Sequence, residues 1–294
     1  MAFSVNTNVG AMTALQSLNA TSKSLSTTQS RINTGLNVAS TKDDSATYSI
    51  AQKLRGNLSD MKAVSQSLQR AKSVIDVAVN GAEQITDYVN QMRTLAKQAS
   101  DSGVGASSLA AYNNDFIALR DQIVTVINSS EFNGTNLLKT GAGSVSALQS
   151  LTNMKTLATD AYIPDTLNVA NQELTLANPE VPSTGADTGQ LGIDSQINTP
   201  AKAMKMVDTL DFLTKNLSSK VATLGSASRA INAQLTFASK LSDTFESGVG
   251  NLVDADLAKE SAKLTALQTK QQLGVQALSI ANQAPQMIGQ LFKG

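Results

Sequence analysis

Residues 61–99 place an apolar side chain at every third or fourth position, and this run limits the possible folds more than any other part of the chain. Its apolar positions are Met61, Val64, Leu68, Ala71, Ile75, Ala78, Ala82, Ile85, Val89, Met92, Ala96 and Ala99. A sustained spacing that alternates three and four residues is typical of a long helix in a supercoiled bundle. A helix from Asp44 to Ser100 would be ~85 Å long, whereas a compact globule of 294 residues would be only ~50 Å across. We therefore expect an elongated fold.

Three other stretches repeat this spacing and predict further helices. The first is a coiled-coil seam with polar residues at two of its positions: Leu15, Leu18, Ser22, Leu25, Gln29, Ile32 and Leu36. The second is shorter and carries Leu109, Tyr112, Phe116, Leu119, Ile123 and Val126. The third begins at Ala201 and has an apolar residue at every seventh position: Leu210, Leu217, Leu224, Ile231, Ala238 and Phe245.

The last predicted helix, in the run of residues 253–292, is apolar on two sides. One stripe consists of Leu257, Leu264, Leu267, Leu278, Ala281 and Ile288. The second stripe, offset around the helix, consists of Leu273, Ile280, Met287 and Leu291. A helix with two apolar faces needs cover on both, which no single neighbouring helix provides. We expect the N-terminal helix of the same chain to cover one stripe and neighbouring copies to cover the other.

The two ends of the chain share an unusual composition. Residues 1–22 and 271–292 contain no charged side chain, although charges are frequent elsewhere. Such ends could be frayed tails. Because the apolar spacing continues through both, we interpret them as helices that are buried against other helices.

Breaks in the helical pattern divide the chain. Asp43 and Asp44 could be metal ligands or an acid/base pair, but adjacent residues point to different faces, so we interpret them as the start of a capped helix. Turns are predicted around Gly103 and Gly105 and at Asn133-Gly134. A further break is predicted at residues 248–251, with Asp254 capping the last helix.

The composition of residues 139–200 differs from the rest. Four of the five prolines of the chain lie in this stretch, at Pro164, Pro179, Pro182 and Pro200. Helical spacing fades here, and residues 166–170 and 173–177 alternate as short strands do. We predict a small β-containing insert between two helical halves. The fold class is therefore mainly α: an elongated antiparallel coiled-coil-like helical bundle with the N- and C-terminal helices paired.

The amino-acid composition argues against several functions. The chain contains no His, Cys or Trp, so it lacks the usual proton shuttle at neutral pH, thiol chemistry and two of the main transition-metal ligands. The 23 basic and 23 acidic residues balance, and no basic cluster is interleaved with aromatic residues, as nucleic-acid binding would require. We also find no Sec-type signal and no run of roughly 20 apolar residues that could span a membrane. We expect no catalytic site, cofactor or metal, no nucleic acid and no membrane insertion.

Several stretches resemble bacterial flagellins, most closely those of alphaproteobacteria. They are Phe3-Ser-Val-Asn-Thr-Asn-Val-Gly-Ala, Gln29-Ser-Arg-Ile-Asn-Thr-Gly-Leu-Asn-Val-Ala-Ser-Thr-Lys-Asp-Asp, Glu131-Phe-Asn-Gly, Gly250-Asn-Leu-Val-Asp-Ala-Asp-Leu-Ala-Lys-Glu-Ser-Ala-Lys-Leu and Gln268-Thr-Lys-Gln-Gln-Leu-Gly-Val-Gln-Ala-Leu-Ser-Ile-Ala-Asn-Gln. Together they cover about residues 1–138 and 200–294, in the family's order.

The resemblance implies a structural subunit that polymerises with copies of itself into the extracellular flagellar filament for swimming motility. It implies export through the flagellum's own type III-like apparatus, and the flagellar cap and hook-junction proteins as further partners. Residues 1–43 and 253–294 would be the inner, channel-lining domain, residues 44–138 and 201–252 the helical bundle, and residues 139–200 the outer variable segment. The candidate assembly residues are Leu15, Leu18, Leu25, Ile32, Leu36, Leu257, Leu264, Leu267, Leu273, Leu278, Ile280, Met287 and Leu291.

The resemblance also concerns recognition by an immune receptor. Many flagellins carry an Arg-x-Arg-Glu-Leu-Ala-x-Gln stretch that a flagellin-sensing Toll-like receptor binds, and residues 91–98 correspond to it. Arg93 and Leu95 match, whereas Gln91 replaces an Arg and Thr94 replaces a Glu. Because the lost Arg removes a multi-donor contact, we predict weak or absent activation of the receptor.

Three alternatives remain open from the sequence. The first is a hook–filament junction protein of the same superfamily, which would stop after one layer rather than add in long runs. The second is an enzyme housed in the middle segment, which zinc content and a peptidase screen would reveal. The third is a coiled-coil tether unrelated to flagella.

Overall fold

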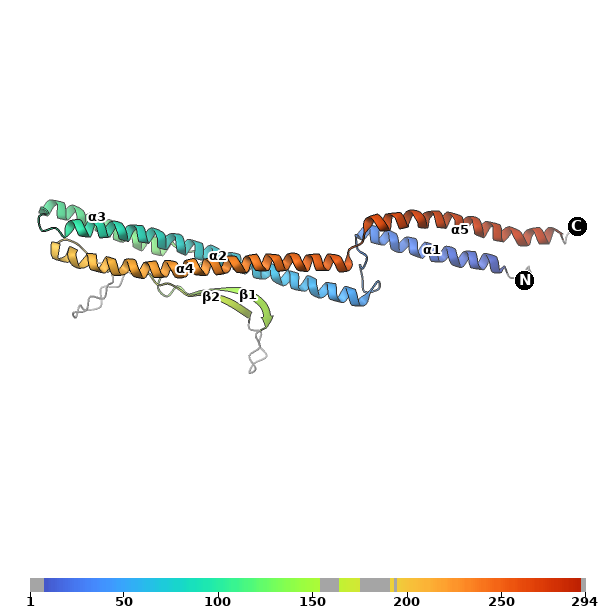
Figure 1. Ribbon diagram of the computed structural model, residues 1–294, viewed down its shortest axis with the longest axis horizontal. Coiled ribbons are helices and arrows are strands. Elements are labelled where there is room, and N and C mark those ends of the chain that lie inside the picture. Colours follow the sequence, from blue (N-terminus) through green and yellow to red (C-terminus); the bar gives the residue numbers. More distant parts are fainter. Residues whose placement is uncertain (1–7, 154–163, 175–190, 193–194, 292–294) are drawn as a thin grey trace, which may run out of the picture. The chain divides into compact units, whose positions relative to one another are not determined.

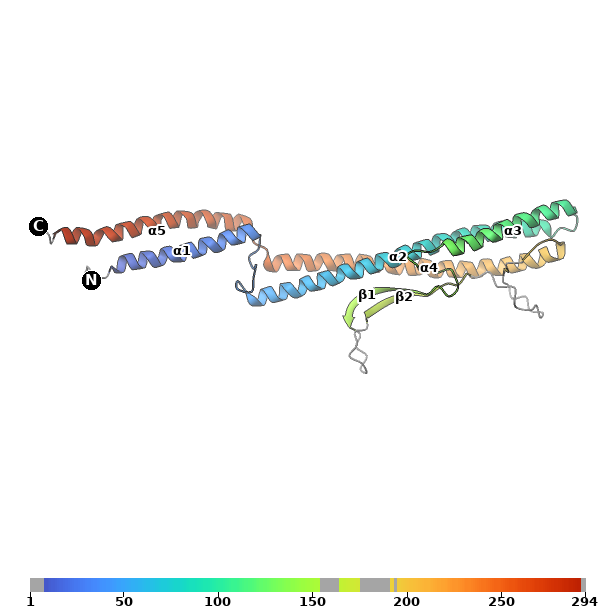
Figure 2. The same ribbon diagram turned by 180° about the vertical axis from the view of Figure 1, so that it is seen from behind.

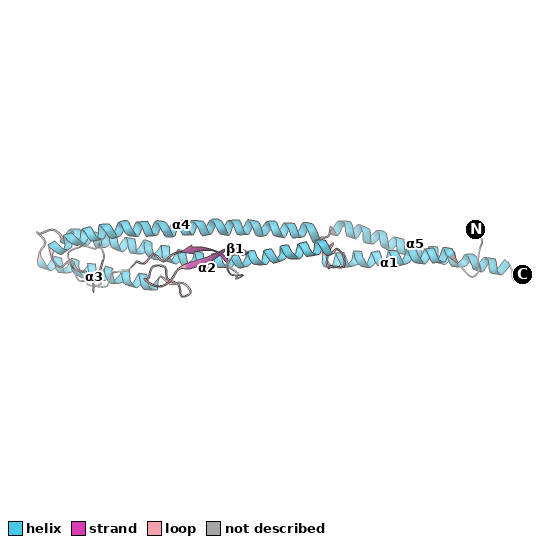
Figure 3. Ribbon diagram, turned by 90° about the horizontal axis from the view of Figure 1, so that it is seen from below, coloured by secondary structure: helices cyan, strands magenta, loops and turns pink. Residues whose placement is uncertain are grey.

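The structure is a computed structural model that describes residues 8–153, 164–174, 191–192 and 195–291. Of residues 151–153, 164 and 284–291 it describes the backbone alone. Helices account for most of the described chain, and the two strands form one small sheet (Figure 3). The elements are α1 (Val9–Thr34), α2 (Ser45–Ala99), α3 (Ala106–Ser129), β1 (Val145–Asn153), β2 (Pro164–Val169), α4 (Pro200–Val253) and α5 (Leu257–Leu291). The mainly helical fold is thus confirmed.

The chain divides into two compact units. One unit comprises residues 59–242, and the other comprises residues 1–58 together with 243–294. Both boundaries fall inside a helix, one in α2 and one in α4.

The core of the unit 59–242 runs along α2. Every position that the three-four spacing of residues 61–99 predicts is fully buried except Met61, which is partly buried against the same core. α3 lies alongside α2, and α4 runs antiparallel to it (Figures 1 and 2). α4 contributes Leu210, Leu217, Leu224 and Ile231 to this core, as its seven-residue repeat predicts. A contact between Arg93 and Asp211 joins α2 and α4 at the surface.

The two strands pack on the helices of this unit. β1 and β2 pair antiparallel from Val145 opposite Val169 to Asn153 opposite Pro164, with irregular register in the second half. Val145, Ala147 and Val169 are buried in the helical core. The hairpin is also held by two side chains of the helices: Ser67 Oγ accepts from the amide of Leu148 at 3.1 Å, and the Gln234 amide donates to the carbonyl of Gln149 at 3.0 Å.

The sequence prediction for the strands was half correct. The predicted strand 166–170 corresponds to β2, whereas β1 was missed. Residues 173 and 174 do not form a strand, and 175–177 lie outside the described residues. Leu174 is buried in the helical core, and its amide donates to the carbonyl of Leu138 at 2.7 Å. The Lys220 ammonium binds the carbonyls of residues 172 and 173. These contacts, rather than pairing with another strand, provide hydrogen bonds to the main chain of residues 172–174.

The predicted turns and the cap of α2 are present. α2 and α3 are separated by residues 100–105, and Asn133 and Gly134 form a tight turn with φ of 51° and 79°. Asp44 accepts from the amides of Ala46 and Thr47 at 3.0 and 3.2 Å, which caps α2. Hydrogen bonds from Thr47 lower the pKa of Asp44 below its usual value.

The predicted break at residues 248–251 and the predicted cap at Asp254 are wrong. α4 continues to Val253 because glycine costs a helix only about 1 kcal/mol and does not forbid it. The cap of α5 is instead Asp256, whose Oδ1 accepts from the amides of Ala258 and Lys259 at 3.0 and 3.1 Å.

None of the described helices is long and apolar enough to cross a membrane.

Candidate assembly surface

In the unit that holds both ends of the chain, α1 and α5 pair antiparallel along their length (Figure 1). At one end the side-chain amide of Asn8 donates to the carbonyl of Ala281 at 2.8 Å. At the other end Arg31 Nη1 lies 3.3 Å from Glu260 Oε1. The prediction that the N- and C-terminal helices pair is therefore confirmed.

The residues that face the partner helix recur every three and four positions on both helices. On α1 they are Ala11, Ala14, Leu18, Thr21, Leu25, Thr28 and Ile32. On α5 they are Glu260, Leu264, Leu267, Gln271, Gly274, Leu278 and Ala281. We call these two rows the α1–α5 seam. The predicted Leu18, Leu25, Ile32, Leu264, Leu267 and Leu278 lie on it.

Part of the predicted seam on α1 was wrong. Ser22 and Gln29 are exposed, and Leu15 is 49% exposed. The polar positions of the seam are instead Thr21 and Thr28, which are buried. At position 21 the Thr21 hydroxyl donates to the carbonyl of Ser17 at 2.9 Å, which satisfies its polar atom inside its own helix. The repeat of Thr21 and Thr28 seven residues apart, each three after a leucine, was the signal available in the sequence.

Leu36 lies outside the seam, because Gly35 ends α1 with a left-handed φ of 70°. Leu36 pairs with Asp254 as an isolated bridge, and the amide of Asn37 donates to the carbonyl of Val253 at 2.7 Å. The amide of Ala255 donates to the carbonyl of Gly35 at 2.9 Å. Val38, Ala51 and Val253 form a small buried cluster beside these bonds. The segments that follow α1 and precede α5 are thus tied together.

Several large apolar side chains of α1 and α5 remain exposed. Ile280 is 69% exposed and Leu273 is 59% exposed, so the second stripe predicted on the last helix has no intramolecular cover at these two positions. Leu257, which belongs to the first predicted stripe, is exposed as well. Met287, Ile288 and Leu291 lie on α5, but their side chains are outside the described residues. We define the outer face of the pair by its exposed apolar residues: Val9, Met12, Leu15, Leu257, Leu273, Val275 and Ile280.

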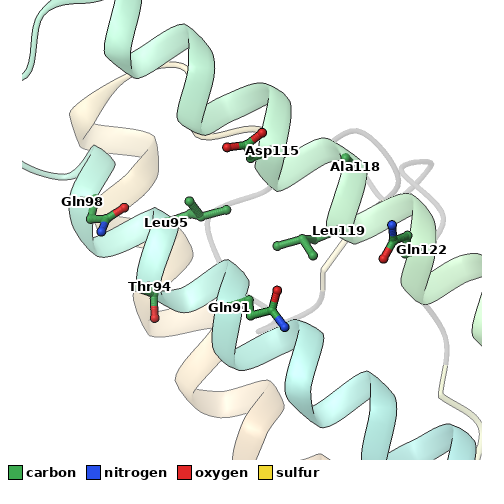
Figure 4. Close-up of a pocket in the computed structure, with 8 residues that line it drawn as sticks. All are labelled: Gln91, Thr94, Leu95, Gln98, Asp115, Ala118, Leu119 and Gln122. Atoms are coloured by element: carbon green, nitrogen blue, oxygen red, sulfur yellow. The ribbon is translucent and has the colours of Figure 1, made fainter.

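The residues predicted to correspond to the receptor motif lie on two sides of α2. Gln91 and Leu95 line a groove of ≈ 540 Å³ between α2 and α3, together with Thr94, Gln98, Asp115, Ala118, Leu119 and Gln122 (Figure 4). Arg93 is not part of this groove and instead contacts Asp211 of α4.

The described residues offer few side chains that could bind a metal ion or catalyse a reaction. No group of three or more His, Cys, Asp or Glu side chains within the described ranges could hold a metal ion. The acidic pair Asp43 and Asp44 is occupied by main-chain amides: Asp43 Oδ2 accepts from the amides of Ala39 and Ser40 at 3.2 and 2.9 Å. What the unit does present is an exposed apolar face on a paired helix.

Comparisons with known proteins agree on one family. The model of the bacterial flagellin N-terminal helical region matches residues 5–142, and that of the C-terminal helical region matches residues 205–292. Flagellin FljK of Caulobacter vibrioides is 43% identical over 290 residues, which cover 99% of this chain and 98% of that one. Flagellin C of Rhizobium meliloti is 30% identical over 321 residues and 99% of both chains. A crystal structure of Bacillus cereus flagellin matches 58% of this chain and 88% of its own, with 18% identity and a TM-score of 0.45.

Proposed function

Because the chain belongs to the bacterial flagellin family, and is therefore a structural subunit of the extracellular flagellar filament, we propose that its α1–α5 pair carries contacts between neighbouring subunits. The outer face of the pair would bury its apolar side chains against other copies. The observation that carries this proposal is the exposure of Leu273 and Ile280 on the helix that pairs with α1.

The physical reason is the free energy of burying apolar surface. Complete burial of an isoleucine side chain stabilises by roughly 1.5–3 kcal/mol. Ile280 is 69% exposed, so an interface that covers it gains about 1–2 kcal/mol per subunit. Leu273 and Ile280 are seven residues apart and therefore lie on one side of α5. Exposed apolar side chains that gather on one surface mark interaction sites.

Substitution of Ile280 tests the proposal. Ile280→Asp would place a charge in the interface, and we expect it to prevent seeded filament growth at subunit concentrations that support wild-type growth. Ile280→Ala, which removes apolar area only, should raise the critical concentration by roughly 5–30-fold, because 1.4 kcal/mol corresponds to a factor of ten. Ile280→Val is the matched control and should grow nearly as the wild type does.

The measurement is sedimentation of filaments grown from wild-type seeds. Because Ile280 is exposed in the single chain, the helical content and thermal unfolding of the soluble Ile280→Asp chain should match the wild type. An Ile280→Asp chain that elongates seeds with wild-type critical concentration would contradict the proposed surface.

We also propose that the segments form three layers in the filament. Residues 1–43 and 253–294 would form the inner, channel-lining layer, residues 44–138 and 201–252 the bundle, and residues 139–200 the outer part. The nested division of the chain into compact units, with both ends in one unit, supports this order. The chain contains no cysteine, so a single introduced cysteine reports whether its position is accessible to a reagent in the filament. Ser279 on α5 and Ser144 are both exposed in the single chain. In filaments, Ser279→Cys should be shielded from a polymer-linked maleimide, whereas Ser144→Cys should react.

The same proposal covers the other partners. The uncharged ends suit passage through a narrow export channel, so the flagellar type III-like apparatus would secrete the chain, and the cap and hook-junction proteins would contact the filament ends. Cells that lack the apparatus should retain the protein inside.

A hook–filament junction role would instead predict that purified protein adds one layer to seeds and stops. We assign the chain no catalytic role, and a peptidase activity that purifies with it would contradict this assignment.

A further inference from the structure

A partly buried ion pair lies at the base of the α1–α5 seam. Arg31 is in the last turn of α1 and Glu260 is in the first turn of α5, where each charge complements its helix dipole. Glu260 is only 8% exposed. Its Oε1 lies 3.3 Å from Arg31 Nη1, and its Oε2 lies 3.9 Å from Lys263 Nζ.

The ion pair is incompletely satisfied. Among the described residues, Arg31 Nε and Glu260 Oε2 are buried without a hydrogen-bond partner, as is Thr28 Oγ1 on the next turn. Glu260 is buried, whereas the Arg31 side chain is still 28% exposed. The loss of hydration of such charges is offset only when the geometry is good and the remaining polar atoms are bonded. One hydrogen bond of 3.3 Å and one longer contact of 3.9 Å, with polar atoms left over, do not meet this condition. The pair is therefore a poor source of stability, and apolar side chains of similar volume would stabilise the seam at least as well.

The apolar side chains of the seam do not define one register. In the observed register Leu18 lies over Gly274, with its Cβ 4.0 Å from the position that a Cβ on Gly274 would take. Moving α5 by one heptad would place Leu25 over Gly274 and Ile32 beside Leu267. Leucine would still meet glycine, and aliphatic side chains would still meet each other. What changes is the ion pair, because the uncharged Leu267, seven residues after Glu260, would then take the place of Glu260 opposite Arg31.

The other ties between the helices are not specific to residue type. The Asn8 amide donates to a main-chain carbonyl, and the bonds of residues 35–37 with 253–255 join main-chain atoms. Main-chain groups inside a helix are already bonded within it, so a shift by one heptad would break the bonds of residues 35–37 with 253–255, and would do so equally in every variant compared below. Arg31 with Glu260 is the side-chain contact that only the observed register makes.

We propose that Arg31 and Glu260 are positioning residues that set the register of the α1–α5 pair. The register decides which side chains of α1 and α5 share the outer face, so the inference rests on the proposed function for its consequence in the filament. In this role the pair resembles the buried polar residues that fix register in coiled coils at a cost in stability.

Engineered cysteines report the register directly, because the chain has none of its own. Leu18→Cys with Gly274→Cys reports the observed register, since a Cβ separation of 4.0 Å suits a disulfide. Leu25→Cys with Gly274→Cys reports the register shifted by one heptad. Each reporter is placed in three backgrounds of the full-length chain: wild type, Arg31→Met with Glu260→Leu, and the charge exchange Arg31→Glu with Glu260→Arg. Both bonds form within one chain, so gel mobility after mild oxidation reads them in soluble protein and in filaments.

The wild type should form the first disulfide at least tenfold faster than the second. The apolar background should keep or raise its thermal stability and lower this ratio by at least about threefold, because no side-chain contact specific to the register then opposes the shift. The charge exchange should restore the wild-type ratio. An apolar background that keeps the tenfold preference would overturn the inference, as would a charge exchange that fails to restore it. Either result leaves the test at Ile280 untouched, so the two proposals fail separately.

Discussion

Replacing Gly81 by alanine is expected to destabilise the unit 59–242, although alanine is the better helix former. An added Cβ would come inside contact distance of Ser130 Oγ and would lie 3.2 Å from Ser130 Cβ and 3.0 Å from Leu138 Cδ1. Ser130 cannot move away freely, because it is buried and its hydroxyl donates to the carbonyl of Val126 at 2.7 Å. Gly81 therefore allows α2 to pass close to the end of α3.

The expected change in the free energy of unfolding on Gly81→Ala is the sum of three contributions. Overpacking costs typically 1–3 kcal/mol, and loss of the Ser130 hydrogen bond adds about 1 kcal/mol. The better helix propensity of alanine returns about 1 kcal/mol. The net loss is about 2 kcal/mol, which should lower the melting temperature by roughly 4–8 °C for a unit of this size.

Gly225→Ala is the matched control, because it makes the same change inside α4, where the nearest atom to the new Cβ would be Arg229 Nη1 at an ordinary 3.7 Å. This variant should gain about 0.5–1 kcal/mol. Urea unfolding of the soluble chain, followed by circular dichroism, measures both. Ser130→Ala should cost less in the Gly81→Ala chain than in the wild type, since it removes the closest contact. Equal shifts for the two glycine variants, or the absence of this coupling, would refute the reasoning.

Two further predictions concern the cap of α2 and the receptor motif. Hydrogen bonds from Thr47 lower the pKa of Asp44, so its contribution to stability is present above the unfolded pKa of 3.8 and is lost as the pH falls through the folded value. Asp44→Ala should therefore reduce the unfolding free energy at neutral pH, and this effect should shrink as the pH falls through the folded pKa of Asp44, where the carboxylate becomes protonated; an effect that does not shrink with falling pH would contradict this. The chain should activate a flagellin-sensing Toll-like receptor weakly in reporter cells, and Gln91→Arg with Thr94→Glu should raise the response, because Gln91 and Thr94 are both exposed and tolerate the change; a wild-type response as strong as that of a flagellin with the full motif would count against it.

The long helices could be predicted from the sequence because their core positions are filled without exception. In α2 the three-four alternation leaves no second choice of face, and all of its predicted positions except Met61 are fully buried. In α1 two faces compete, because Leu18, Leu25 and Ile32 belong to both. The face that includes Ser22 and Gln29 is as polar as the face that includes Thr21 and Thr28. Only the contact with α5 decides between them.

Other features depended on contacts between residues distant in the sequence. β1 was missed because α2 and α4 hold it in place. Ser67 of α2 and Gln234 of α4 form hydrogen bonds with its main chain. The buried Glu260 could not be recognised in an exposed-looking first turn, since its partner Arg31 lies 229 positions away. The end of α4 was misplaced because glycine was given more weight than the continuing apolar positions Val249 and Val253, which pack in the cluster with Val38 and Ala51.

The distribution of side-chain size over α1 and α5 explains why such a pair is suited to assembly. Much of the seam between them consists of small or polar residues: Ala11, Ala14, Thr21, Thr28, Gln271, Gly274 and Ala281. Larger aliphatic side chains, such as Met12, Leu273 and Ile280, are exposed on the outside. Because the free energy of burial scales with apolar area, pairing within one chain leaves a large part of the available stabilisation unused. In the assembly proposed above, contacts with neighbouring copies would supply it, because they would cover the larger aliphatic side chains.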